Sequence, residues 1–171
     1  MSKLVFITGA SSGLGQALAL RYYAAGYRLA LAARRTAQVQ CWAQAHAIPL
    51  GHYQIYSADV SDINSIVAAG QACIALQGLP DVVIANAGIS IGMDTGMRED
   101  MEIMAQTLAT NTLGVAATFH PFVEGMRTRG TGVLVGIGSV AGRGLPGHGA
   151  CCASKAAVIS YCESLRGELN I

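Results

Sequence analysis

Residues 8–15 read Thr-Gly-Ala-Ser-Ser-Gly-Leu-Gly, and this stretch decides the fold. It follows a short aliphatic run, 4–8, and opens a segment of helical periodicity, 14–25. Gly9 lets the chain turn tightly off a strand, Gly13 permits close approach to a pyrophosphate, and Gly15 allows tight packing of helix against sheet. The helix N-terminus then offers unpaired N–H groups to phosphates. Glycines also mark ordinary turns, but between a strand and a helix this pattern predicts nucleotide binding.

The rest of the chain alternates short aliphatic runs with helical segments. The predicted strands are 4–8, 28–33, 54–58, 81–85 and 133–138. The predicted helices are 14–25, 37–47, 63–77, 98–129 and 154–169. This alternation predicts an α/β fold, a doubly wound parallel sheet of strand order 3-2-1-4-5 with helices on both faces. Because no linker or repeat interrupts it, residues 1–171 are expected to form a single dinucleotide-binding domain.

Composition argues against several classes of partner. Hydrophobic residues make up 52% of the chain and charged residues 12%, which fits a sheet covered on both faces. A net charge of +1 gives no bulk attraction to nucleic acid or anionic membrane. No apolar run approaches the ~20 residues of a membrane span, and the first apolar run meets the glycines before it could form a signal-peptide core. We therefore expect a cytoplasmic protein that binds neither nucleic acid nor membrane.

The cysteines and histidines suggest no metal site. The five cysteines, at positions 41, 73, 151, 152 and 162, are an odd number without C-x-x-C or other ligand spacing. This pattern predicts reduced, mostly buried thiols. His46, His52 and His120 lack ligand spacing too, and His148 stands three residues before Cys151 without an identified partner.

Two arginines follow the second predicted strand, in the sequence Ala32-Ala33-Arg34-Arg35. A carboxylate near this point would bind the ribose of NAD, whereas arginine suits the 2′-phosphate of NADP. We expect NADP in preference to NAD, with Arg34 as the first direct contact and Arg35 as the second. The alternative is that both arginines only begin a solvated helix.

The next two strand ends carry further candidates. Asp59 and Val60 follow the third strand and would lie beside an adenine ring, although an aspartate here also fits a helix start. Small residues follow the fourth strand, where a cofactor could lie against the backbone: Asn86-Ala87-Gly88.

The last candidates lie at the end of the fifth strand, near the start of the fifth predicted helix and within the fourth. Ser139 ends the fifth strand, at the crevice mouth. Lys155 lies four residues after Cys151, so both project from one helix face. Asn111 is an amide within a long helical segment, and amides are poor helix-interior residues. It therefore either disrupts the helix locally or faces the crevice.

In this order and spacing, the motifs resemble those of the short-chain dehydrogenase/reductase family over the whole chain. The resemblance implies an NADP(H)-dependent oxidoreductase that interconverts a carbonyl and an alcohol of a small molecule by hydride transfer. It also implies a homodimer or homotetramer, built by the long fourth and fifth crossover helices. The implied cofactor-binding residues come from every motif: Gly9, Ser11, Ser12, Gly13, Leu14, Gly15, Arg34, Arg35, Asp59, Val60, Asn86, Ala87, Gly88 and Lys155.

The resemblance also assigns a catalytic set. Ser139 would orient the substrate oxygen, and Lys155 would bind the nicotinamide ribose and lower the pKa of the catalytic acid. Asn111 would anchor a water of the proton relay. The family's acid is a tyrosine four residues before the lysine, and here that position is Cys151.

Cys151 is expected to impair activity because of its reach. By covalent geometry a cysteine sulfur ends about 4 Å short of a tyrosine hydroxyl oxygen. Proton transfer requires hydrogen-bond distance or one bridging water, and losing a general acid costs ~10²–10⁴-fold in rate. We also expect the family's last strands to be absent. The alternatives are a catalytically silent NADP-binding or assembly module, and a fragment that neither binds nor catalyses.

Overall fold

The structure is a computed structural model that describes residues 2–169. Its five strands form one parallel sheet in the order β3-β2-β1-β4-β5. The strands are β1 (Leu4–Thr8), β2 (Arg28–Ala33), β3 (Tyr53–Ser57), β4 (Val82–Ala85) and β5 (Val133–Gly136). The longer helices are α1 (Gly13–Ala24), α2 (Thr36–Ala45), α3 (Ile63–Gln77), α4 (Asp100–Leu108), α5 (Gly114–Arg129) and α6 (Gly149–Leu169). The predicted fold class and strand order are confirmed.

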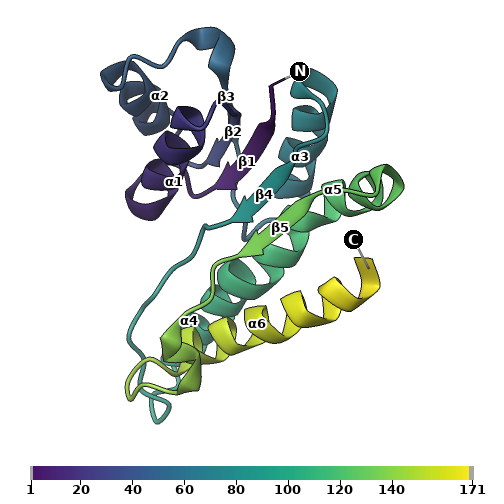
Figure 1. Cartoon of the computed structure of the whole chain (residues 1–171). Coiled ribbons are helices and arrows are strands. Elements are labelled where there is room, and N and C mark those ends of the chain that lie inside the picture. Colours follow the sequence, from purple (N-terminus) through teal and green to yellow (C-terminus); the bar gives the residue numbers. More distant parts are fainter. Residues whose placement is uncertain (1, 170–171) are drawn as a thin grey trace.

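Helices cover both faces of the sheet, as Figure 1 shows. Successive residues of β1 point to opposite faces, as the strand's two-residue period requires. Val5 and Ile7 lie in a core with α1 and α2, and Leu4 and Phe6 lie in a core with α3, α5 and α6. Every residue of β1 is buried. This explains why the strand reads as an unbroken apolar run rather than an alternating one.

One predicted helix is divided in the structure. The segment 98–129 forms α4, then a π-helical turn η2 (Ala109–Leu113), then α5. Asn111, in the middle of the π turn, is fully buried, so its side chain must find partners inside the protein. Asn111 therefore lies where the helix is locally disrupted, which was one of the two expectations for it. Among residues 2–169, no helix is both long and apolar enough to cross a bilayer.

Two predicted boundaries near the candidate catalytic residues were wrong. β5 ends at Gly136, and Ser139 instead caps a short 3-10 helix, η3 (Val140–Arg143), where its Oγ accepts a hydrogen bond from the Ala141 N–H at 3.1 Å. A serine that bonds nearby backbone favours such a turn over a strand. α6 begins at Gly149, not at position 154. Its first turn is rich in residues of low helix propensity, but burial of Cys151 and Cys152 outweighs that preference.

Candidate functional site

The glycine stretch makes the turn that was predicted. Gly9 has φ +68°, a left-handed conformation that glycine adopts without strain. Ser12 is extended, and α1 begins at the next residue. Within the described residues, Ser12 makes no side-chain hydrogen bond to the first N–H groups of α1, and the first turn carries no acidic residue. The helix N-terminus therefore keeps its N–H groups and its positive dipole end available for an anion.

Close contacts hold the glycine stretch against the end of β4. A Cβ atom added to Gly15 would clash with the Gly9 carbonyl oxygen and would lie 2.9 Å from Asn86 Nδ2. Asn86 Nδ2 donates to the carbonyl oxygen of Thr8 at 2.9 Å, and Thr8 Oγ1 accepts from the N–H groups of Asn86 and Ala87 at 3.1 Å each. The side chain of Asn86 is thus turned toward the glycine stretch. Thr8, which sequence reasoning placed only within the phosphate stretch, links two strand ends.

A pocket of about 150 Å³ opens at the carboxyl ends of these strands. It brings together eight of the predicted cofactor residues: Gly9, Ser11, Arg34, Arg35, Asp59, Val60, Ala87 and Gly88. It is also lined by residues that the motifs did not identify: Ala32, Ala33, Ala58, Ser61, Ile89, Gln106 and Thr110. The other six predicted cofactor residues, Ser12, Gly13, Leu14, Gly15, Asn86 and Lys155, do not line it. The pocket lies where parallel sheets of this order bind ligands.

The two arginines at the end of β2 have different partners. Arg35 Nη2 donates to Ser11 Oγ at 3.2 Å and to Ser12 Oγ at 3.3 Å. Arg34 Nη1 lies 3.5 Å from Asp59 Oδ2; the Arg34 side chain is 68% exposed and the Asp59 side chain 38%. Arg35, which was ranked second on sequence, is therefore the arginine joined to the glycine stretch, whereas Arg34 pairs with an acid across the pocket.

Asp59 forms a local turn as well as a pocket wall. Its Oδ1 accepts from the N–H and the hydroxyl of Ser61, at 2.9 Å and 2.7 Å. The Ser61 hydroxyl is the main cause of a lowered Asp59 pKa, and Arg34 adds a smaller effect in the same direction. The start of α3 is capped by a different acid, Asp62, which accepts from two backbone N–H groups.

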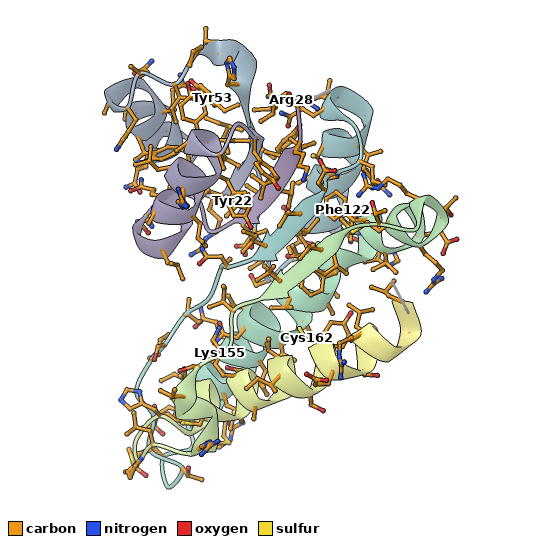
Figure 2. All side chains as sticks on the ribbon, viewed as in Figure 1. Tyr22, Arg28, Tyr53, Phe122, Lys155 and Cys162 are labelled. Carbon is orange, nitrogen blue, oxygen red and sulfur yellow. The ribbon has the colours of Figure 1, made fainter. Side chains whose placement is uncertain are left out.

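Lys155 reaches from α6 toward the segment that leaves β5 (Figure 2). Its Nζ donates to the carbonyl oxygen of Ile137 at 2.7 Å, and a Cβ added to Gly88 would lie 3.5 Å from the same nitrogen. Burial lowers the Lys155 pKa, and the neighbouring Cys151 opposes that shift to a smaller extent. Cys151 is buried in the first turn of α6, and Ser139 is exposed. Lys155 and Gly88 thus meet beside the pocket.

The side chain of Asn111 forms hydrogen bonds to the Ile89 backbone and to Ser154 of α6. Its Oδ1 accepts from the Ile89 N–H at 2.8 Å, and its Nδ2 donates to the Ile89 carbonyl oxygen at 2.8 Å and to Ser154 Oγ at 3.0 Å. Sequence reasoning missed Ser154; a small hydroxyl beside a candidate lysine was the available signal. Across residues 2–169, no group of three His, Cys, Asp or Glu side chains is placed to hold a metal ion.

Known proteins resemble this chain in sequence. It is 36% identical to a dehydrogenase/reductase SDR family protein 7-like from Anopheles gambiae, over 98% of this chain and 54% of the relative. It is 35% identical to human 17-beta-hydroxysteroid dehydrogenase type 1, over 95% of this chain and 51% of that protein. The chain therefore spans about half the length of these relatives.

Solved structures and a family model agree with this similarity. A short-chain dehydrogenase from Streptomyces avermitilis superposes with a TM-score of 0.90 at 30% identity, covering 99% of this chain and 61% of that one. An alcohol dehydrogenase from Thermococcus sibiricus, complexed with 5-hydroxy-NADP, gives a TM-score of 0.89 at 28% identity, covering 98% of this chain and 72% of that one. The family model described as short chain dehydrogenase matches residues 3–171. The chain belongs to the short-chain dehydrogenase family of oxidoreductases.

Proposed function

We propose that this chain is the NADP(H)-binding domain of an oxidoreductase that interconverts a small-molecule carbonyl and alcohol. The observation that carries the proposal is the hydrogen bonding of Arg35 to Ser11 and Ser12, at the uncapped start of α1. A guanidinium and two hydroxyls beside a helix N-terminus suit a phosphate group. Glycines at positions 9 and 15 support the same role, because a Cβ at either one would press on Asn86 Nδ2 and force the glycine stretch away from the end of β4.

The dinucleotide, when bound, supplies or accepts the hydride. The proposed tasks of the protein are to hold it and to manage the substrate oxygen and its proton. Lys155 would contact the nicotinamide ribose, and Ser139 would hydrogen-bond the substrate oxygen. Cys151 stands at the proton donor's position, and its thiol ends about 4 Å short of where a tyrosine hydroxyl would lie. Turnover by this chain is therefore proposed to be weak.

The cofactor preference can be measured by titrating the chain with NADPH and with NADH. We expect NADPH to bind more tightly and to raise the melting temperature of a cooperative transition. Arg35→Ala should weaken NADPH binding by about tenfold or more, because hydrogen bonds to charged groups are among the strongest. It should leave NADH affinity nearly unchanged, because we propose that Arg35, beside the end of β2, holds the 2′-phosphate that NADH lacks.

Arg34→Ala is the matched comparison for Arg35→Ala. Its loss of NADPH affinity should be smaller, because Arg34 is engaged by Asp59. Equal affinity for the two cofactors in the unaltered chain would contradict the proposed preference, and a larger loss from Arg34→Ala would contradict the role proposed for Arg35. Binding of NADPH without any turnover would support the silent NADP-binding module. Failure to melt cooperatively would support the fragment.

We also propose that the domain forms a cytoplasmic homodimer or homotetramer through α5 and α6. An apolar hollow of about 430 Å³ supports this assembly, with Ile63, Leu113 and Tyr161 among its lining. Ile63 and Leu113 are 52% and 55% exposed in the single chain, and a partner subunit would cover them. Leu113→Glu should shift the chain to monomer in analytical ultracentrifugation. A chain that sediments as a monomer before substitution would contradict the proposal.

A further inference from the structure

A chain of buried hydrogen bonds joins the first turn of α6 to the wall of the cofactor pocket. Ser154 Oγ donates to the Cys151 carbonyl oxygen at 2.8 Å and accepts from Asn111 Nδ2 at 3.0 Å. Asn111 holds both backbone polar groups of Ile89, which lines the pocket. Ser154 and Asn111 are completely buried. The Ser154 hydroxyl thus joins α6 to the π turn, and the Asn111 amide joins the π turn to Ile89.

These hydrogen bonds do more than give a buried serine hydroxyl a partner. A buried helix serine can satisfy itself by donating to the carbonyl one turn earlier, and Ser154 does so. The same oxygen also accepts a hydrogen bond from the side-chain amide of Asn111, which lies in the π turn. Without that oxygen, one N–H of a fully buried amide would lose its partner, and buried unpaired donors are costly. The packing of Asn111 against α6 therefore depends on Ser154.

The same hydroxyl fixes the turn that carries Lys155. Lys155 follows Ser154 directly, and its Nζ lies over Gly88 and bonds to the Ile137 carbonyl oxygen at 2.7 Å. Rotation of this turn about the helix axis would move Lys155 away from Gly88. The bond between Asn111 and Ser154 opposes such a rotation, because it joins α6 to the π turn.

We propose that Ser154 is a positioning residue for the nicotinamide half of the dinucleotide. Through its bond to Asn111 it holds the start of α6 against the π turn, and so it sets the helix turn that presents Lys155. Ser154 itself touches neither cofactor nor substrate. The proposal rests on the proposed function, because it takes the pocket to hold a nicotinamide dinucleotide.

The test compares two ligands in Ser154→Ala. Affinity for NADPH should fall about tenfold, because two hydrogen bonds are lost and a buried amide N–H is left unpaired. Affinity for 2′,5′-ADP, which lacks the nicotinamide half, should change by less than about twofold, because Arg35 and the glycine stretch are distant from the substitution in the hydrogen-bond network. Ser154→Cys should be intermediate, since a thiol is a weaker donor and acceptor.

Thr112→Val is the matched control. Thr112 also links the π turn to α6, by donating to the Ser154 carbonyl oxygen at 3.4 Å, but it makes no bond to Asn111. Thr112→Val should lower the melting temperature while NADPH affinity stays within about twofold of the unaltered chain. In a chain that already carries Asn111→Ala, Ser154→Ala should cost little further affinity, because Ser154 acts through Asn111.

Three results would overturn the role of Ser154. They are unchanged NADPH affinity in Ser154→Ala, an equal loss for NADPH and 2′,5′-ADP, and an equal loss from Thr112→Val. If Ser154→Ala does not fold, the same comparisons on Ser154→Cys decide. An unaltered chain that binds neither NADPH nor NADH would overturn the proposed function and this proposal together. Any of the three results above, in a chain that binds NADPH before substitution, would overturn this proposal alone.

Discussion

Cys151→Tyr should raise NADPH-dependent carbonyl reduction by about 10²–10⁴-fold, the contribution of one positioned general acid. Residue 151 lies in the first turn of α6, four residues before Lys155, so a tyrosine there would project from the same helix face. Its hydroxyl would extend about 4 Å beyond the cysteine sulfur, within reach of a substrate oxygen. The measurement is the initial rate of NADPH oxidation with a panel of aldehydes and ketones.

Cys151→Phe is the control for this gain. Phenylalanine brings the same ring without the hydroxyl, so it should leave the rate at the level of the unaltered chain while changing the packing in the same way. Ser139→Ala, added to Cys151→Tyr, should remove most of the gain, because Ser139 is proposed to orient the substrate oxygen. Equal rates for the tyrosine and phenylalanine variants would contradict the assignment of position 151 as the proton donor.

Gly15→Ala should destabilise the fold by about 3 kcal/mol, at the upper end of the usual cost of overpacking. The added methyl group would overlap the Gly9 carbonyl oxygen and press on Asn86 Nδ2. A backbone carbonyl cannot rotate away as a flexible side chain can, so the glycine stretch must move off the end of β4. NADPH affinity should fall by more than about tenfold, since the helix N–H groups move with it. Urea denaturation and fluorescence titration measure the two effects.

Gly167→Ala is the matched substitution for Gly15→Ala. Gly167 also lies within a helix, but a Cβ there would meet nothing within 4 Å. Alanine should therefore stabilise α6 by about 0.5–1 kcal/mol, the usual helix preference over glycine, and leave NADPH affinity unchanged. If both alanines shifted stability in the same direction, the close approach of Gly15 to Gly9 would not be the cause.

The aliphatic runs and the glycine stretch were enough to predict the sheet. β1 and β2 have the predicted bounds, and the remaining strands lie in the predicted order. These features are visible in sequence because strand and helix periodicity are local properties, and because alternating strands and helices leave few topologies open. The predicted end of β5 and the predicted start of α6 were wrong because the Ser139 cap and the burial of Cys151 oppose local preference.

The motif at the end of β2 could not predict which partners each of the two arginines has. Arg34 and Arg35 are adjacent, and composition offers no basis for choosing between them. Side-chain direction at the end of β2 gives them different partners: Arg34 lies beside Asp59, and Arg35 lies beside Ser11. Such contacts join residues from separate strand ends, so no local pattern contains them.

The sequence by itself determined the strand order, the glycine turn and the family, because each depends on residue types at fixed short spacings. Only the tertiary structure decided how the candidate residues are held together. Asn111 and Ser154 are 43 positions apart and meet because α6 packs against the π turn. Buried polar groups need hydrogen-bond partners, and tertiary packing determines which groups lie within reach. The glycine stretch likewise depends on a distant residue, because Asn86 at the end of β4 donates to the Thr8 carbonyl oxygen.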